Sequence, residues 1–239
     1  MTVRVNGRHL AQARLDGKTL ASARLNGRQV YSSGIRNFFE PWDVPMAVDW
    51  FLQMDPASEQ AGAYPTAGGY LVPGVPDGLW SGKPSSTIYT QKEVDNRQGT
   101  WEVLTGPQRA TAGLYTGIVL ATDDRARRQL LAVEWDRNGL VVRYRLSVSS
   151  PWVELGKVSR SFTGEDTVKV VRDATRSVPV LTVFHDGVQI GQWDDTSGVQ
   201  ETKGHRHVGV RTQGDRSLFT ISHSPWVDHF RFTTELEYE

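Results

Sequence analysis

The chain has 239 residues, 38% of them hydrophobic and 10% aromatic, which suits one large all-β domain or one domain with an appendage. Its 27 Lys and Arg residues balance 27 Asp and Glu residues, so no overall positive field gathers nucleic-acid phosphates. The absence of Cys excludes disulfides, thiolate catalysis and cysteine-based zinc sites. The sequence has no apolar run long enough to span a membrane, so we expect no membrane insertion. It also lacks a signal-sequence pattern, so we expect the protein to be made without a signal peptide.

Residues 3–32 repeat one ten-residue pattern three times, as VRVNGRHLAQ, ARLDGKTLAS and ARLNGRQVYS. A plain meander of long strands joined at each Asn/Asp-Gly would place Leu15 and Leu20 on opposite faces, leaving neither face apolar. A second turn in each repeat, at Ala11-Gln12 and Ala21-Ser22, instead stacks the apolar positions as a small β-solenoid. The stacked positions are Val5, Leu10, Leu15, Leu20, Leu25 and Val30.

This repeat segment, residues 1–33, is too small to be stable by itself. At ~25 cal/mol per Å² its buried apolar area barely offsets the entropy of ordering it. We therefore expect the segment to anchor an assembly, either as a homo-oligomer, with a trimer favoured, or by docking onto a larger structure. The alternative is a β-rich arm that lies across its own domain.

The rest of the chain is dominated by β patterns. Residues 34–66 mix aromatics with Pro and are expected to form a connecting segment. Over residues 67–239, short alternating runs separated by turn residues predict an antiparallel jelly-roll β-sandwich. Asn138-Gly139 and Asp186-Gly187 each lie between two such runs and predict β-hairpins.

Glu134 and Asp136, in AVEWDRNG, are the nearest approach to a catalytic pair of carboxylates. Residues two apart on a strand share a face, and glycoside hydrolases place two carboxylates across the scissile bond. The third acid of the Glu-x-Asp-x-x-Glu pattern is missing, because the chain turns at Arg137-Asn138-Gly139. The favoured interpretation is a solvated strand end that leads into a hairpin.

Histidines and tryptophans provide the remaining candidates. His205 and His207 form a His-x-His pair, which becomes a metal site if an oligomer supplies further ligands, although two exposed loop histidines are the favoured interpretation. Trp80 and Trp152 lie in Gly/Ser/Pro-rich surroundings, where aromatic side chains stack on sugar rings. A structural plug is the favoured interpretation for both, and a sugar-binding platform is the alternative. We assign no catalytic residue, no metal ligand and no cofactor.

The order of strand motifs resembles the concanavalin-A-like, or laminin-G-like, jelly roll over about residues 68–235. VKVVRD is followed by the hairpin LTVFHDGVQIGQW, a Gly-rich strand and the closing strand VDHFRF. This resemblance implies a β-sandwich of a superfamily that includes lectins. The metal and sugar ligands of those lectins are not carried over, because no matching acidic calcium loop is present.

The repeats followed by this sandwich resemble minor tail proteins of siphophages that infect actinobacteria. That resemblance implies a virion protein made in the host cytoplasm, with other virion proteins as partners. The leading hypothesis is a non-enzymatic tail protein whose jelly roll is displayed and contacts either the host cell wall, where glycan is one candidate ligand, or neighbouring subunits. A carbohydrate-binding module and a glycoside hydrolase are the alternatives.

Overall fold

The computed structural model describes most of residues 37–234 and parts of the repeat segment. The described residues are 4–5, 8–9, 14–15, 18–19, 22–25, 28–32, 37–44, 46, 50–54, 63–75, 86–90, 94, 96–109, 111–123, 129–147, 149–200, 206–218 and 220–234. Within them every regular element is a β-strand. A search of the same residues for a helix that is long and apolar enough to span a membrane finds none.

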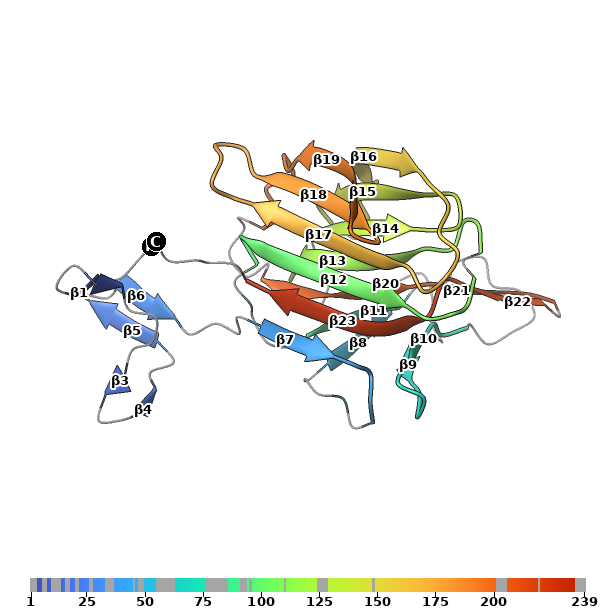
Figure 1. The fold of residues 1–239 in the computed structure, drawn as a ribbon, viewed down its shortest axis with the longest axis horizontal. Coiled ribbons are helices and arrows are strands. Elements are labelled where there is room, and N and C mark those ends of the chain that lie inside the picture. The colour runs from blue at the N-terminus through green and yellow to red at the C-terminus, as the bar shows by residue number, and fades with distance from the viewer. Residues whose placement is uncertain are drawn as a thin grey trace.

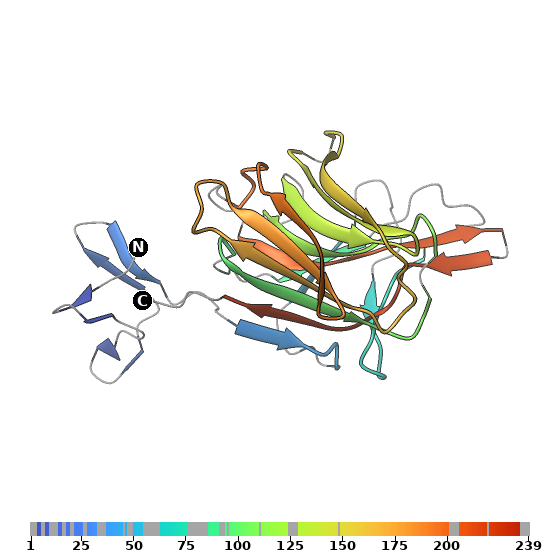
Figure 2. The same ribbon diagram turned by 45° about the horizontal axis from the view of Figure 1, so that its top comes forward.

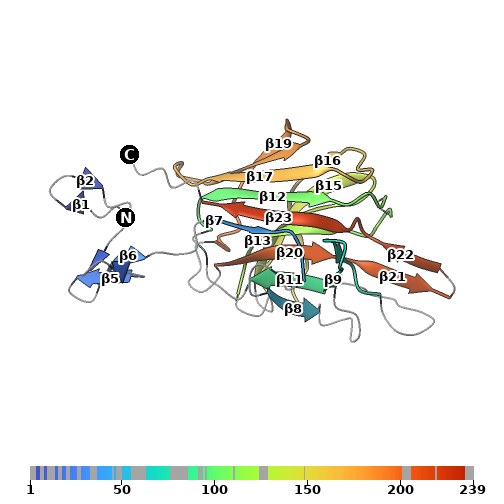
Figure 3. The ribbon, with the colours of Figure 1, turned by 60° about the horizontal axis from the view of Figure 1, so that its bottom comes forward.

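Two antiparallel sheets stack face to face (Figures 1 and 3). The first has seven strands, in the spatial order β16 (Val153–Ser159), β15 (Gly139–Arg145), β14 (Leu130–Trp135), β13 (Thr116–Thr122), β20 (His207–Thr212), β11 (Ser86–Thr90) and β8 (Trp50–Met54).

The second sheet has eight strands. Seven follow the order β19 (Val188–Asp194), β18 (Val180–His185), β17 (Thr167–Asp173), β12 (Gly99–Thr105), β23 (Val227–Thr233), β10 (Leu71–Val72) and β9 (Tyr64–Pro65), and β7 (Asn37–Glu40) also pairs with β23. The predicted all-β jelly-roll sandwich is therefore confirmed.

The core lies between the inner faces of the two sheets. Alternation along β12 buries Trp101 and Val103, while β14 contributes Val133 and Trp135 from the opposite sheet. Because buried apolar area drives folding, this alternation fixes which side of each strand faces inward.

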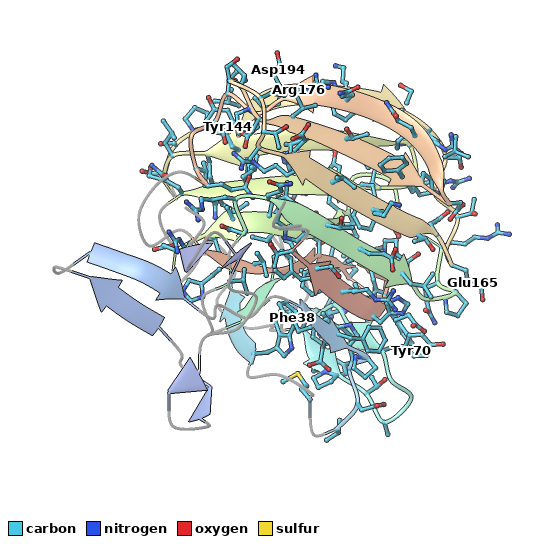
Figure 4. The ribbon with its side chains drawn as sticks, turned by 60° about the vertical axis from the view of Figure 1, so that its left-hand side comes forward. Phe38, Tyr70, Tyr144, Glu165, Arg176 and Asp194 are labelled. Carbon is cyan, nitrogen blue, oxygen red and sulfur yellow. The ribbon has the colours of Figure 1, made fainter. Side chains whose placement is uncertain are left out.

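The stretch 34–66, expected to be a connecting segment, supplies three strands of the sandwich, one of which is β9, paired with β10. β7 pairs with β23, and β8 pairs with β11. Glu40 of β7 is buried and accepts hydrogen bonds from Trp42 N (2.9 Å) and Trp50 Nε1 (2.7 Å). The pairing of β7 with β23 and of β8 with β11 joins residues far apart in the chain. Such pairing leaves no periodic signal in a stretch of 33 mixed residues, so the sequence pattern did not predict these strands. In Figure 4, Phe38 of β7 lies toward the opposite side of the sandwich from Asp194 and Arg176.

Both predicted hairpins form, with different turns. Asp186 and Gly187 have positive φ values of 50° and 78°, as a two-residue type I′ turn requires. The β14–β15 turn is instead centred on Arg137-Asn138, one residue earlier than the Asn-Gly pair suggests. The amide of Asp136 donates to Gly139 O (3.0 Å). In the opposite direction, the amide of Gly139 donates to the carboxylate of Asp136 instead of to its backbone carbonyl.

Three short antiparallel strand pairs lie in the repeat segment, and the two strands of each pair stand on either side of one Asn/Asp-Gly dipeptide in the sequence. The strands are β1 (Arg4–Val5) with β2 (Arg8–His9), β3 (Arg14–Leu15) with β4 (Lys18–Thr19), and β5 (Ser22–Leu25) with β6 (Arg28–Ser32). These hairpins belong to neither large sheet and lie beside the sandwich (Figure 2).

The predicted second turn of each repeat is only partly described. At Ala21-Ser22 the prediction is wrong for Ser22, which begins β5 because it pairs with Ser32 across the last hairpin. Leu10, Leu20 and the Ala11-Gln12 pair lie outside the described residues. The stacking of Val5, Leu15, Leu25 and Val30 stays a prediction.

Candidate functional site

The outer face of the seven-stranded sheet brings together residues from three neighbouring strands. Gly117 of β13 pairs with Arg211 of β20 on one side and with Glu134 of β14 on the other. Because Val133 and Trp135 point into the core, Glu134 points outward. A Cβ atom on Gly117 would lie 2.6 Å from Glu134 Cγ. Because glycine has no Cβ, position 117 leaves the space in which Arg211 forms its ion pair with Glu134.

Glu134 lies between two arginines. Its carboxylate accepts hydrogen bonds from Arg143 Nε and from Arg211 Nη1, and its side chain is fully buried. Burial by itself raises the pKa of a carboxyl group, but the charges of Arg211 and Arg143 outweigh it and hold the pKa of Glu134 below 4.5. Glu134 is therefore anionic at neutral pH, the opposite of what a general acid needs.

Asp136 holds the β14–β15 hairpin. One carboxylate oxygen accepts from the amides of Asn138 (2.8 Å) and Gly139 (3.0 Å), and the other accepts from the amide of Gly113 (2.7 Å). A strand end leading into a hairpin is thus the right interpretation of this pair. The predicted solvation is wrong, since Asp136 is only 6% exposed and Glu134 is fully enclosed.

Trp152 lies in the loop between β15 and β16 and packs onto the same outer face. Its ring contacts a small apolar cluster formed by Val119, Leu130 and Ala132. Three guanidinium carbons surround the half-buried ring, at centroid distances of 4.5 Å for Arg143, 5.0 Å for Arg145 and 5.5 Å for Arg211.

Arg143 also lies over a second aromatic ring, 5.1 Å from the centroid of Tyr115. We call this group the Trp152 cluster; it consists of Tyr115, Glu134, Arg143, Arg145, Trp152 and Arg211. It combines aromatic surface with guanidinium donors, and cation–π contacts together with the Glu134 ion pairs hold it in place. Such a surface suits a ligand that has both a ring and polar groups.

The other tryptophan and histidine candidates are placed less favourably. Trp80 and His205 lie outside the described residues, so their suggested roles stay predictions. His207 is the first residue of β20 and only 4% exposed. The interpretation of His207 as an exposed loop residue is therefore wrong, because the strand extends further toward the N-terminus than the loop-like KGHRH suggests.

A second titratable group lies at the start of β17 and in the β18–β19 turn. Asp166, His185 and Asp186 place ligand atoms within 4.8 Å of one another. His185 Nε2 is 2.9 Å from Asp166 Oδ1 and 3.2 Å from Asp186 Oδ2. Arg160 Nε donates to His185 Nδ1 (2.5 Å), and Nε2 is the ring nitrogen that faces the two carboxylates. These contacts join the residue before β17 to the strand β18 and the β18–β19 turn.

The sequence interpretation missed Tyr115, Arg143 and Arg211. Alternation in GLVVRYRLS places Arg143 and Arg145 on the face opposite Leu140 and Val142, which is a usable signal. No local pattern reveals that Arg211, 77 residues from Glu134, meets the same carboxylate.

Comparisons with known proteins place the fold. No family model matches the chain, and no curated protein matches it. The lumenal domain of VIP36 in a Ca²⁺/Man-bound form is 12% identical, with a TM-score of 0.54 over 85% of this chain and 91% of that one. A Bacillus licheniformis β-glucanase is also 12% identical, with a TM-score of 0.52 over 86% of this chain and all of the other.

A β-1,3-glucanase from Mycobacterium marinum is similar to the same extent, at 14% identity and a TM-score of 0.51 over 84% of this chain and 100% of that chain. The chain is thus a concanavalin-A-like jelly roll, which confirms that part of the sequence resemblance. At these identities the likeness defines the fold alone.

Proposed function

We propose that the protein is a glycan-binding module that holds a saccharide on the outer face of its seven-stranded sheet without cleaving it. The observation that carries the proposal is the Trp152 cluster, where two half-buried aromatic rings flank a guanidinium group. Aromatic rings stack on the apolar faces of sugars, and arginines donate hydrogen bonds to their oxygens. VIP36, which shares the fold, is described in a mannose-bound form, and this likeness is consistent with the proposal.

The contacts of the acidic pair favour binding over hydrolysis. The glucanases among the similar structures make hydrolysis the natural alternative. Here the two oxygens of Glu134 each face a guanidinium, and three backbone amides occupy the carboxylate of Asp136. Neither carboxyl is arranged to donate a proton to a leaving group or to attack a sugar carbon.

Polysaccharide binding and cleavage can be measured on the same samples. The full chain is incubated with a panel of insoluble and soluble cell-wall polysaccharides; bound protein is quantified, and released sugars are separated by chromatography. We expect retention on at least one polymer with no released oligosaccharide. Trp152→Ala should reduce retention at least tenfold, whereas Tyr64→Ala, which removes an aromatic ring 52% exposed on β9, should leave it unchanged. Release of sugars that Glu134→Gln abolishes would show a hydrolase instead.

We further propose that the module belongs to a virion surface, as a minor tail protein whose repeats attach it to other virion proteins. The observation in favour is the regular series of three hairpins that join neither sheet of the sandwich. Such small hairpins are stabilised when they pack against copies of themselves or a larger assembly. Immunogold labelling of assembled particles tests this location.

A further inference from the structure

We infer that the saccharide recognised at the Trp152 cluster carries a carboxylate, which the guanidinium of Arg143 receives between Tyr115 and Trp152. This inference rests on the proposed glycan-binding function and specifies its ligand as an acidic sugar, such as a uronate.

The guanidinium of Arg143 is held at its Nε edge by an ion pair, and its Nη edge is available to a ligand. Its Nε pairs with Glu134, and its guanidinium carbon lies 4.5 Å from the Trp152 centroid and 5.1 Å from the Tyr115 centroid. Its side chain nevertheless remains 19% exposed. Within the part of the chain that the structure describes, its terminal Nη groups donate no hydrogen bond. The two Nη groups thus form an immobilised planar fork, the arrangement that binds a carboxylate through two parallel hydrogen bonds.

The two flanking rings add polar atoms beside this fork. The backbone of Tyr115 is held by Gln213 Oε1 (2.7 Å), which fixes the position of the residue. Neither the Tyr115 hydroxyl nor Trp152 Nε1 makes a hydrogen bond with the described residues. Both side chains are half-buried. A sugar ring bonded to Arg143 through its carboxylate therefore meets aromatic surface and hydrogen-bonding groups at the same place.

The local charges favour an anion. Arg143 and Arg211 both pair with Glu134, and these three side chains together carry a formal charge of +1. The nearest acid on the adjacent strand, Glu154, is opposite Arg143 in the β15–β16 register, but it forms an ion pair with Lys157 at 3.8 Å. A guanidinium at a half-buried site attracts an anion more strongly than one in bulk water, because screening is weaker.

The test is calorimetric titration of the full chain with galacturonate, glucuronate and mannuronate tetrasaccharides, each as the acid and as its neutral methyl ester. We expect at least one acid to bind at least tenfold more tightly than its ester, with an affinity that falls as salt rises. Arg143→Lys keeps the charge but loses the planar fork, and should reduce the acid's affinity at least tenfold. Arg176→Ala removes an exposed cation from the β17–β18 loop of the other sheet and should change the acid's affinity less than twofold.

The alternative outcomes separate the two claims. Equal affinity for acid and ester, or tight binding of neutral glucans alone, would overturn the carboxylate inference and leave glycan binding intact. Preferential binding of a glycerol-phosphate oligomer would assign the site to phosphate and also overturn it. Failure of every saccharide would overturn both claims. If Arg143→Lys unfolds, the acid-to-ester comparison on the unaltered chain still decides.

Discussion

At the scale of single residues, the outer face of the seven-stranded sheet depends on an absent side chain. Gly117 separates Arg211 from Glu134 in the sheet, and only a residue without Cβ leaves room for their contact. The resulting ion pairs are buried, and a buried charge is tolerated only when it is paired and hydrogen-bonded. The same arginines that pair with Glu134 pack against Trp152, so the acid supports the aromatic surface rather than reacting.

Gly117→Ala should destabilise the fold and weaken saccharide binding together. The added Cβ would lie 2.6 Å from Glu134 Cγ and 3.1 Å from Val133 O, so the glutamate or the strand must shift. We expect a loss of about 1–3 kcal/mol, the usual cost of overpacking, in urea unfolding. Gly68→Ala is the matched control, because its Cβ would meet nothing closer than 3.7 Å. An unchanged urea midpoint for Gly117→Ala would contradict this account.

Glu134 should also make stability sensitive to acid. Its pKa in the folded protein is lowered, so its stabilising contribution is present above the ordinary value of 4.5 and is lost as pH falls through the folded value. Urea midpoints between pH 3 and 7 should therefore fall less steeply with acid in Glu134→Gln than in the unaltered chain. At pH 7 the variant should be less stable by about 3–5 kcal/mol, because two arginines lose their buried partner. Identical pH slopes would count against the ion pairs.

At the scale of elements, what the sequence reveals depends on how local each contact is. Alternation and the Asp186-Gly187 turn are local, and both predict the structure correctly. The Arg137-Asn138 turn was misplaced by one residue because a side chain, Asp136, supplies an acceptor that backbone patterns ignore. β7 and β8 went unrecognised because their partners, β23 and β11, lie far along the chain. Trp152 could be proposed from its local sequence, whereas Arg143 and Arg211 could not be assigned to the same site because they lie on other strands.

The β14–β15 hairpin offers an element-scale prediction about Asp136. Asp136→Ala removes the acceptor for three backbone amides at a buried position. At about 1 kcal/mol for each hydrogen bond, we expect a loss of roughly 2–3 kcal/mol in the free energy of unfolding. Affinity for the saccharide should stay within twofold, since the carboxylate of Asp136 accepts from the backbone amides of Gly113, Asn138 and Gly139, which lie outside the Trp152 cluster. Loss of binding in a folded variant would instead give Asp136 a direct role with the ligand.

At the scale of the whole molecule, the chain combines a well-packed sandwich with three small hairpins that belong to neither sheet. A two-stranded hairpin is marginally stable in water, so these repeats gain most from association. The strand pairing on either side of each Asn/Asp-Gly dipeptide agrees with the preference of this dipeptide for two-residue hairpin turns. No comparable short motif in a single sequence indicates association between chains, so the oligomer remains a prediction.

Mass measurement of the purified protein tests that prediction. We expect the full chain to form a homo-oligomer, with a trimer favoured, and residues 34–239 to be monomeric, because the sandwich buries its own core. Both samples should bind saccharide equally at each site, since the Trp152 cluster lies within the sandwich. A full chain that is monomeric at high concentration would remove the assembly role of the repeats.

The central claim is that a saccharide contacts Trp152, and the indole N–H resonances of the eight tryptophans report on it directly. Trp152→Phe identifies the Trp152 resonance, and the uronate tetrasaccharide that binds in calorimetry is then titrated into the ¹⁵N-labelled chain. We predict a saturable shift of the Trp152 resonance, while those of Trp101 and Trp135, enclosed in the core, stay in place. Saturable shifts confined to other tryptophans, with Trp152 unmoved, would contradict the account.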